Sequence, residues 1–178
     1  IAIYSNYSWI TINSAATTNV TVTEMLNVSK GGSINITGKY LQPNYQASGN
    51  FIYANTESNL VIKDAELTSP NQIALFGNTT IENTIISNIA NKGYTPTNFR
   101  NQTGTLNMKD VTFNYDGTGN TTFGSEIGFG GTNNFENVTI NSTLNSNNVV
   151  EFSYGSISNL TNCNFNGQNG IFTNANVT

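Results

Sequence analysis

The stretch Leu106-Asn-Met-Lys-Asp-Val-Thr-Phe113 decides the fold, because a closely similar stretch, Asn133-Asn-Phe-Glu-Asn-Val-Thr-Ile140, follows it. In each eight-residue window the third and eighth residues are bulky and apolar, and the fifth is Asp or Asn. The same pattern occurs in Leu60–Leu67, Thr79–Ile86 and Ser158–Phe165, and more weakly in Ile34–Leu41, where the fifth residue is Gly. Self-similarity at a roughly regular period indicates a repeat architecture.

A second apolar segment lies between most windows. Its copies are Phe51–Tyr53, Ile73–Phe76, Ile127–Phe129, Val149–Phe152 and Ile171–Phe172. The interval before the window at 106–113 departs from this rule, since it offers only Phe99 within a long polar stretch. Each period of roughly 19–27 residues is therefore expected to hold three short strands, the first two joined by a tight turn. No helical pattern interrupts them, which excludes a βαβ architecture.

Short strands at a recurring period predict an all-β fold, a single-stranded parallel β-helix (solenoid) of about six to seven coils. Neighbouring coils pair about 4.8 Å apart, so equivalent residues stack into columns. The third-position and eighth-position columns are expected to fill the interior; they are Ile36, Ile62, Ile81, Met108, Phe135 and Leu160, and Leu41, Leu67, Ile86, Phe113, Ile140 and Phe165. The leucine-based consensus and helical half-repeat of leucine-rich repeats are missing.

The fifth-position column is the predicted turn ladder, formed by Asp64, Asn83, Asp110, Asn137 and Asn162. Asn and Asp tolerate the left-handed backbone of a sharp bend, and stacked Asn side chains can hydrogen-bond along the column. The fourth-position column, which reads Lys63, Glu82, Lys109, Glu136 and Thr161, would place opposite charges on neighbouring coils if it points outward. Such exposed pairs contribute only ~0–1 kcal/mol each, so they support the register rather than hold the fold.

The segment Asn59-Leu-Val-Ile-Lys-Asp64 and its counterparts resemble the asparagine-ladder turn of pectate-lyase-like right-handed β-helices. The resemblance covers about residues 34–172. It implies the fold but not the function, because that fold carries lyases, phage tailspikes and adhesins alike.

The composition excludes several classes of protein. Half of the 178 residues are Asn, Thr, Ser or Gly and only 9% are charged, yet eight Tyr and ten Phe argue against disorder. The few Lys and Arg are scattered, so no nucleic-acid partner is predicted, and no apolar run approaches the length of a membrane span. The lone Cys163 excludes an internal disulfide and a cysteine-based metal site.

The chemistry available to the chain is limited by the absence of histidine, the commonest general base. No catalytic residue, metal site or cofactor is predicted. Glu136 and Glu151 are the candidates for a glycosidase-type carboxylate pair, but isolated solvent-facing acids are the favoured interpretation. Asp116-Gly-Thr-Gly-Asn120 resembles a calcium loop only faintly, since further acidic ligands are lacking.

Candidate binding residues fall in the two longest intervals, Ser87–Thr105 and Asn114–Glu126. Loops extruded from a rigid solenoid often carry binding residues, and aromatic and Arg side chains are favoured at interfaces. The candidates are Tyr94, Phe99, Arg100, Tyr115 and Asp116. The alternative interpretation is that both loops merely cover the flank of the solenoid.

The composition and coil pattern are also similar to those of autotransporter-type bacterial adhesin passengers. That resemblance implies an exported, non-enzymatic segment at the cell surface, attached to a protein or glycan of host or sister cells. Residues 1–178 are expected to be one interior stretch of a longer solenoid, ~30 Å long. Without capping sequences the isolated stretch is expected to self-associate.

Two alternative functions are considered. One is a polysaccharide lyase, hydrolase or tailspike depolymerase on the same fold. The other is a glycosylated archaeal surface or filament protein, suggested by Asn-x-Ser/Thr sequons such as Asn19, Asn35 and Asn137.

Overall fold

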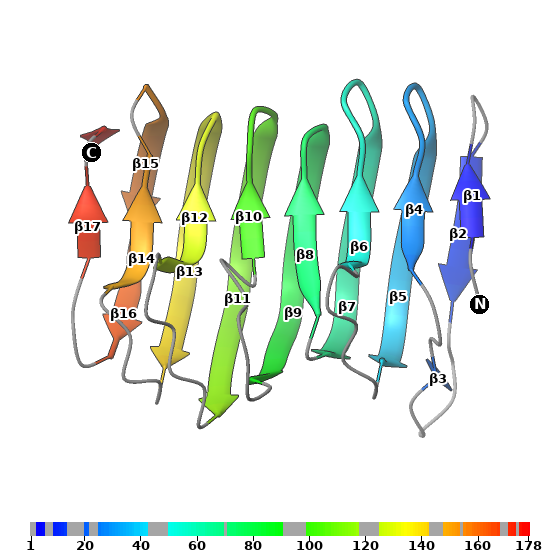
Figure 1. The fold of residues 1–178 in the computed structure, drawn as a ribbon, viewed down its shortest axis with the longest axis horizontal. Coiled ribbons are helices and arrows are strands. Elements are labelled where there is room, and N and C mark those ends of the chain that lie inside the picture. Colours follow the sequence, from blue (N-terminus) through cyan, green and yellow to red (C-terminus); the bar gives the residue numbers. More distant parts are fainter. Residues whose placement is uncertain are drawn as a thin grey trace.

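The computed structural model shows an all-β parallel solenoid (Figure 1). The structure describes residues 3–5, 9–13, 20–21, 25–42, 50–69, 71–90, 99–117, 125–142, 148–153, 155–167, 171–173 and 175–178. Within these ranges the chain forms strands and turns and no helix. The strands make two parallel sheets that lie one behind the other, with the two ends of the chain at opposite ends of the long axis.

The eight-stranded sheet faces the viewer in Figure 1 and contains most of the apolar segments that lie between the windows. Its strands, in spatial order, are β1 (Ile3–Ser5), β4 (Leu26–Val28), β6 (Asn50–Ala54), β8 (Gln72–Leu75), β10 (Phe99–Asn101), β12 (Ser125–Phe129), β14 (Asn148–Phe152) and β17 (Ile171–Thr173). The sequence offered only Phe99 for the place of β10. Phe99 nevertheless pairs with Ile73 on one side and Ile127 on the other, so the sheet continues without a gap.

The ten-stranded sheet contains the repeated windows. Its path runs through β2 (Trp9–Asn13), β5 (Ser33–Leu41), β7 (Asn59–Ser69), β9 (Asn78–Ala90), β11 (Thr105–Gly117), β13 (Thr132–Ser142), β15 (Ile157–Thr161) and β18 (Asn176–Val177). Two short strands lie off this path: β3 (Val20–Thr21) pairs with β5, and β16 (Asn164–Asn166) pairs with β13. From β7 to β13 each window is one continuous strand, not the two strands expected, because the turn residue bends the strand without ending it.

The predicted register of the third position is confirmed. Residues in this column are direct strand neighbours from Ile36 through to Leu160. From Ile36 to Phe135 they are at most 3% exposed, and Leu160 is partly buried against the same core. The apolar alternation of the windows therefore does point one set of side chains into the interior.

The eighth-position column is confirmed from Leu67 to Phe165, but Leu41 does not belong to it. Tyr40, not Leu41, pairs with Leu67, and it is buried. The cause is a register shift between Ile36 and Gly38, because the first window crosses the bend with one residue fewer than the others. Burial also raises the pKa of the Tyr40 hydroxyl, since the interior disfavours the phenolate.

The predicted six to seven coils are not matched. About four regular turns, with long strands in the ten-stranded sheet, lie between β5 and β13. Beyond them, on the path of that sheet, β2, β15 and β18 are five residues long or shorter. β2 and β18 lie outside the stretch from Ile34 to Phe165, where the sequence lacks the full window pattern, whereas the window at 158–165 is divided between the short strands β15 and β16.

The core between the two sheets is continuous and rich in aromatic rings. The ring centroid of Phe129 lies 4.7 Å from that of Phe135 and 5.3 Å from that of Phe152. Because these residues come from both sheets and from neighbouring turns, the rings join the layers together. Ring pairs of this kind add about 0.5–1.5 kcal/mol beyond their buried area.

Candidate functional site

The turn ladder on the ten-stranded sheet adopts the left-handed backbone that the sequence predicts. Its φ angles lie between 45° for Asn83 and 55° for Asn137, with Asp64, Asp110 and Asn162 in the same range. Few residues other than Gly, Asn and Asp tolerate this region, which explains the restricted fifth position. Each bend turns two successive side chains outward, so a polar surface follows the outer face of the sheet.

Side chains of the turn ladder are hydrogen-bonded along the solenoid in one direction. The amide nitrogen of Asn83 donates to Asp64 Oδ1 at 2.6 Å, and that of Asn137 donates to Asp110 Oδ1 at 2.9 Å. Asn162 Nδ2 in turn donates to Asn137 Oδ1 at 3.3 Å. Each turn therefore donates to the turn before it, except that the Asp110 carboxylate has no N–H to offer Asn83.

We expect Asp110→Asn to stabilise the fold by about 0.5–1 kcal/mol, because the new amide can donate to Asn83 and its oxygen can still accept from Asn137. Asp64→Asn is the matched control. Asp64 lies opposite the register shift between Ile36 and Gly38, where β5 supplies no Asn or Asp to continue the ladder, so the stability of this variant should not rise. Urea denaturation of both variants measures the difference, and an equal gain in both would contradict the ladder argument.

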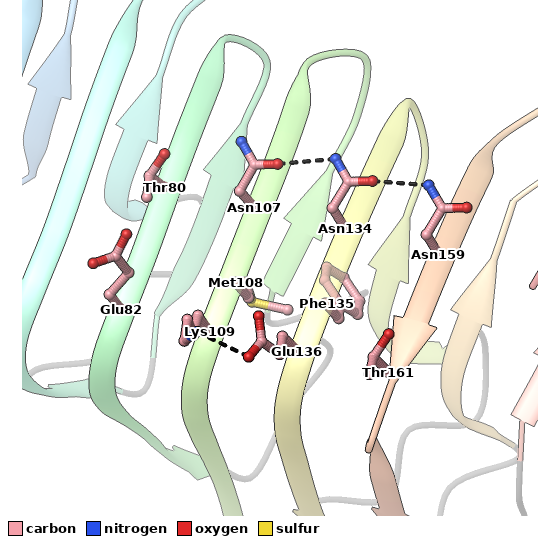
Figure 2. A pocket seen from close by; sticks show the side chains of 10 residues that line it. All are labelled: Thr80, Glu82, Asn107, Met108, Lys109, Asn134, Phe135, Glu136, Asn159 and Thr161. Atoms are coloured by element: carbon pink, nitrogen blue, oxygen red, sulfur yellow. Dashed lines mark hydrogen bonds and ion pairs between the residues drawn. The ribbon is translucent and has the colours of Figure 1, made fainter.

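A shallow groove of about 310 Å³ runs across four strands on the outer face of the ten-stranded sheet (Figure 2). It lies over β9, β11, β13 and β15, between the second-position and fourth-position columns of the windows. Its lining residues are Thr80, Glu82, Asn107, Met108, Lys109, Asn134, Phe135, Glu136, Asn159 and Thr161. The groove therefore presents polar groups that recur once per strand, about 4.8 Å apart.

One wall of the groove is a second amide ladder, formed by Asn107, Asn134 and Asn159. Asn134 Nδ2 donates to Asn107 Oδ1 and Asn159 Nδ2 donates to Asn134 Oδ1, both at 2.9 Å (Figure 2). We name these three residues the groove ladder. This ladder was not predicted, although its signal was present: Asn occupies the second position of the windows at 106–113, 133–140 and 158–165.

The opposite wall is the fourth-position column, and its alternating charges do pair. Lys63 Nζ lies 2.7 Å from Glu82 Oε2, and Lys109 Nζ lies 2.8 Å from Glu136 Oε1. The hydrogen bond to Glu136 and the negative charge of that carboxylate raise the pKa of Lys109. Lys109 therefore stays protonated at neutral pH and can donate hydrogen bonds into the groove.

The five predicted binding residues do not lie together in this groove. Phe99 and Tyr115 are buried core side chains on β10 and β11, so their placement on exposed loops is wrong. Strands form there because both side chains pack on Phe113, at centroid distances of 5.0 and 6.3 Å. Arg100 is exposed on the eight-stranded sheet; with the Gln102 amide turned so that its oxygen faces the guanidinium, that oxygen accepts from Arg100 Nη1 and Nε at 2.8 and 3.0 Å. Tyr94 lies outside the described residues, as does the side chain of Asp116.

The carboxylates do not form an evident catalytic or metal centre in the described part of the chain. Glu136 lies on the ten-stranded sheet and Glu151 on the eight-stranded sheet, so the fold separates the two candidates for a glycosidase pair. Among the described residues, no three Asp, Glu or Cys side chains are grouped so that they could hold a metal ion. The loop after Gly117 lies outside the described ranges.

The described residues include no helix that could span a membrane. Comparisons with protein-family models, with curated proteins and with solved structures give no match to this chain.

Proposed function

We propose that this chain is a non-enzymatic, adhesin-type segment that attaches a surface-exposed or secreted solenoid to a glycan of a host or sister cell. The groove on the ten-stranded sheet is the binding site in this proposal. We further propose right-handed winding of the pectate-lyase-like kind, because parallel crossover connections are almost always right-handed.

The observation that carries the proposal is the repetition of polar groups along the groove. The groove ladder and the charged wall offer donors and acceptors once per strand, at a spacing of about 4.8 Å. A saccharide chain advances by a comparable distance per sugar and carries hydroxyl groups that both donate and accept. Such a chain lying along the solenoid can meet equivalent groups on successive strands.

Binding of this kind draws on many weak contacts instead of one deep pocket. Each net hydrogen bond contributes about 0.5–1.5 kcal/mol, so three or four successive contacts are needed for useful affinity. The walls are open to solvent, and a long polymer can be engaged at several places at once, which strengthens attachment by multivalency. This suits adhesion better than turnover of a small substrate.

We expect Asn134→Ala to weaken glycan binding at least about tenfold, because it removes the central amide of the groove ladder and frees both neighbours. The matched control is Asn141→Ala. Asn141 is the centre of another ladder on the same strand, where it donates to Asn114 at 3.1 Å and accepts from Asn166 at 2.9 Å, but it does not line the groove.

Both variants are to be measured on a glycan array and on whole cells, with urea denaturation as a check on the fold. The proposal expects loss of binding for Asn134→Ala only. Equal binding by both variants, or no binding of the unmodified chain to any glycan or cell, would overturn it. Release of oligosaccharides from a bound polymer would favour an enzyme instead.

A further inference from the structure

Both walls of the groove are interrupted where strand β9 lies beside strand β11, and we call this place the step from β9 to β11. On the amide wall, the neighbour of Asn107 on β9 is Thr80, not another Asn. On the charged wall, Glu82 and Lys109 are strand neighbours, yet their ion pairs point away from each other, to Lys63 and to Glu136. Figure 2 shows Thr80 and Glu82 of β9 on one side of this step and Asn107 and Lys109 of β11 on the other.

A hydrogen-bond donor and an acceptor face the groove at this step from opposite walls. The oxygen of Asn107 accepts from Asn134, and Figure 2 shows its amide nitrogen on the side of β9. That nitrogen carries two N–H donors. Glu82 engages Lys63 through Oε2, and a carboxylate can accept about four hydrogen bonds in all. A ligand group here meets N–H on one side and a carboxylate on the other.

Asn107 and Glu82 lie on neighbouring strands and two positions apart along the strand direction, a separation of about 8 Å at the backbone. A secondary amide suits such a gap, because its C=O and N–H project in opposite directions. A hydroxyl donates and accepts at a single atom, so it can reach only one wall well. The side chains of Met108 and Phe135 point into the core and are 2% and 3% exposed, so the floor between the two walls is strand backbone.

We propose that the step from β9 to β11 is a subsite for the acetamide group of an N-acetylated sugar. The acetamide oxygen accepts from Asn107 Nδ2, the acetamide N–H donates to Glu82, and the methyl group lies over the strand backbone between the two walls. This inference rests on the proposed function, since it assigns a sugar class to the same groove. It makes Asn107 and Glu82 the residues that distinguish N-acetylated sugars from plain hexoses.

The test compares two probes that differ only at C2, tetrasaccharides of N-acetylglucosamine and of glucose with the same linkage. Titration calorimetry should show the N-acetylated probe binding about tenfold more tightly. In Asn107→Asp the oxygen that accepts from Asn134 is kept while the donor is lost, so this preference should disappear. Asn114→Asp is the control, because it makes the same change where Asn114 accepts from Asn141 outside the groove.

The possible results separate the two proposals. Equal affinity for both probes in the unmodified chain, or a preference that survives Asn107→Asp, overturns the subsite while binding to the groove still stands. Loss of the preference in Asn114→Asp also overturns it. If neither probe binds, the subsite is wrong, and the glycan array with Asn134→Ala then decides whether the groove binds any glycan.

Discussion

Replacing Phe99 by Ala is expected to destabilise the fold by about 3–5 kcal/mol, the usual cost of deleting a fully buried aromatic ring. Phe99 is 0% exposed, and its ring lies 5.0 Å from that of Phe113 and 6.1 Å from that of Phe129. The short strand β10 has three residues, so Phe99 and Asn101 are its only inward side chains. The cavity left by the missing Phe99 ring cannot be filled by another side chain of the same strand.

The neighbouring Arg100→Ala is the control for this prediction, because Arg100 is on the same strand but exposed. Its substitution should change the free energy of unfolding by less than about 1 kcal/mol. Thermal and urea denaturation of the two variants measure the difference. A Phe99→Ala variant with unchanged stability but impaired ligand binding would instead support Phe99 as a surface binding residue.

Column register was predictable from the sequence because it depends on local rules repeated in every window. Alternation assigns Ile62 and Ile81 to the interior, and the left-handed bend restricts the fifth position to residues such as Asp64 and Asn83. The salt bridge between Lys109 and Glu136 follows from the same register. These features need only the spacing within a window and stacking at equal positions.

The features that the sequence did not reveal depend on how turns of different length are accommodated. Phe99 lies in a polar stretch, yet it is buried because its strand neighbours Ile73 and Ile127 offer a place in an existing sheet. Tyr40 replaces Leu41 in the core because the first bend is one residue shorter. Tertiary pairing overrides local composition in both cases.

The groove was hidden for a different reason. Its walls combine window positions that are polar in all four strands lining the groove, and polarity alone does not separate a binding surface from any solvated face. Asn107 and Asn134 form a ladder outside the predicted turn column, which only the stacking of outward side chains reveals. Asn recurs at the second position of three windows, but this repetition does not indicate a binding groove by itself. The groove becomes evident only when the structure places the charged fourth-position column opposite these Asn residues.

Replacing Gly104 by Ala is expected to cost about 3 kcal/mol or more, at or above the upper end of the usual overpacking range. A Cβ on Gly104 would overlap the carbonyl oxygen of Gly77 in the turn before it, and a Cβ on Gly131 would likewise overlap that of Gly104. The obstructing atoms are backbone atoms of stacked turns. The strand pairs on both sides, β9 with β11 and β11 with β13, hold those turns at the sheet spacing. Relief therefore requires neighbouring coils to move apart.

Gly155 provides the matched control, since it occupies the corresponding turn before β15 and has a φ of 79°, but a Cβ there would meet nothing within 4 Å. Gly155→Ala should cost only about 1–2 kcal/mol, the penalty for a left-handed residue with a side chain. Urea denaturation of both variants separates close approach from backbone conformation. If the two substitutions cost the same, close stacking of the turns is not what restricts this position to glycine. A left-handed conformation would not explain the loss either, because Gly104 does not have a positive φ.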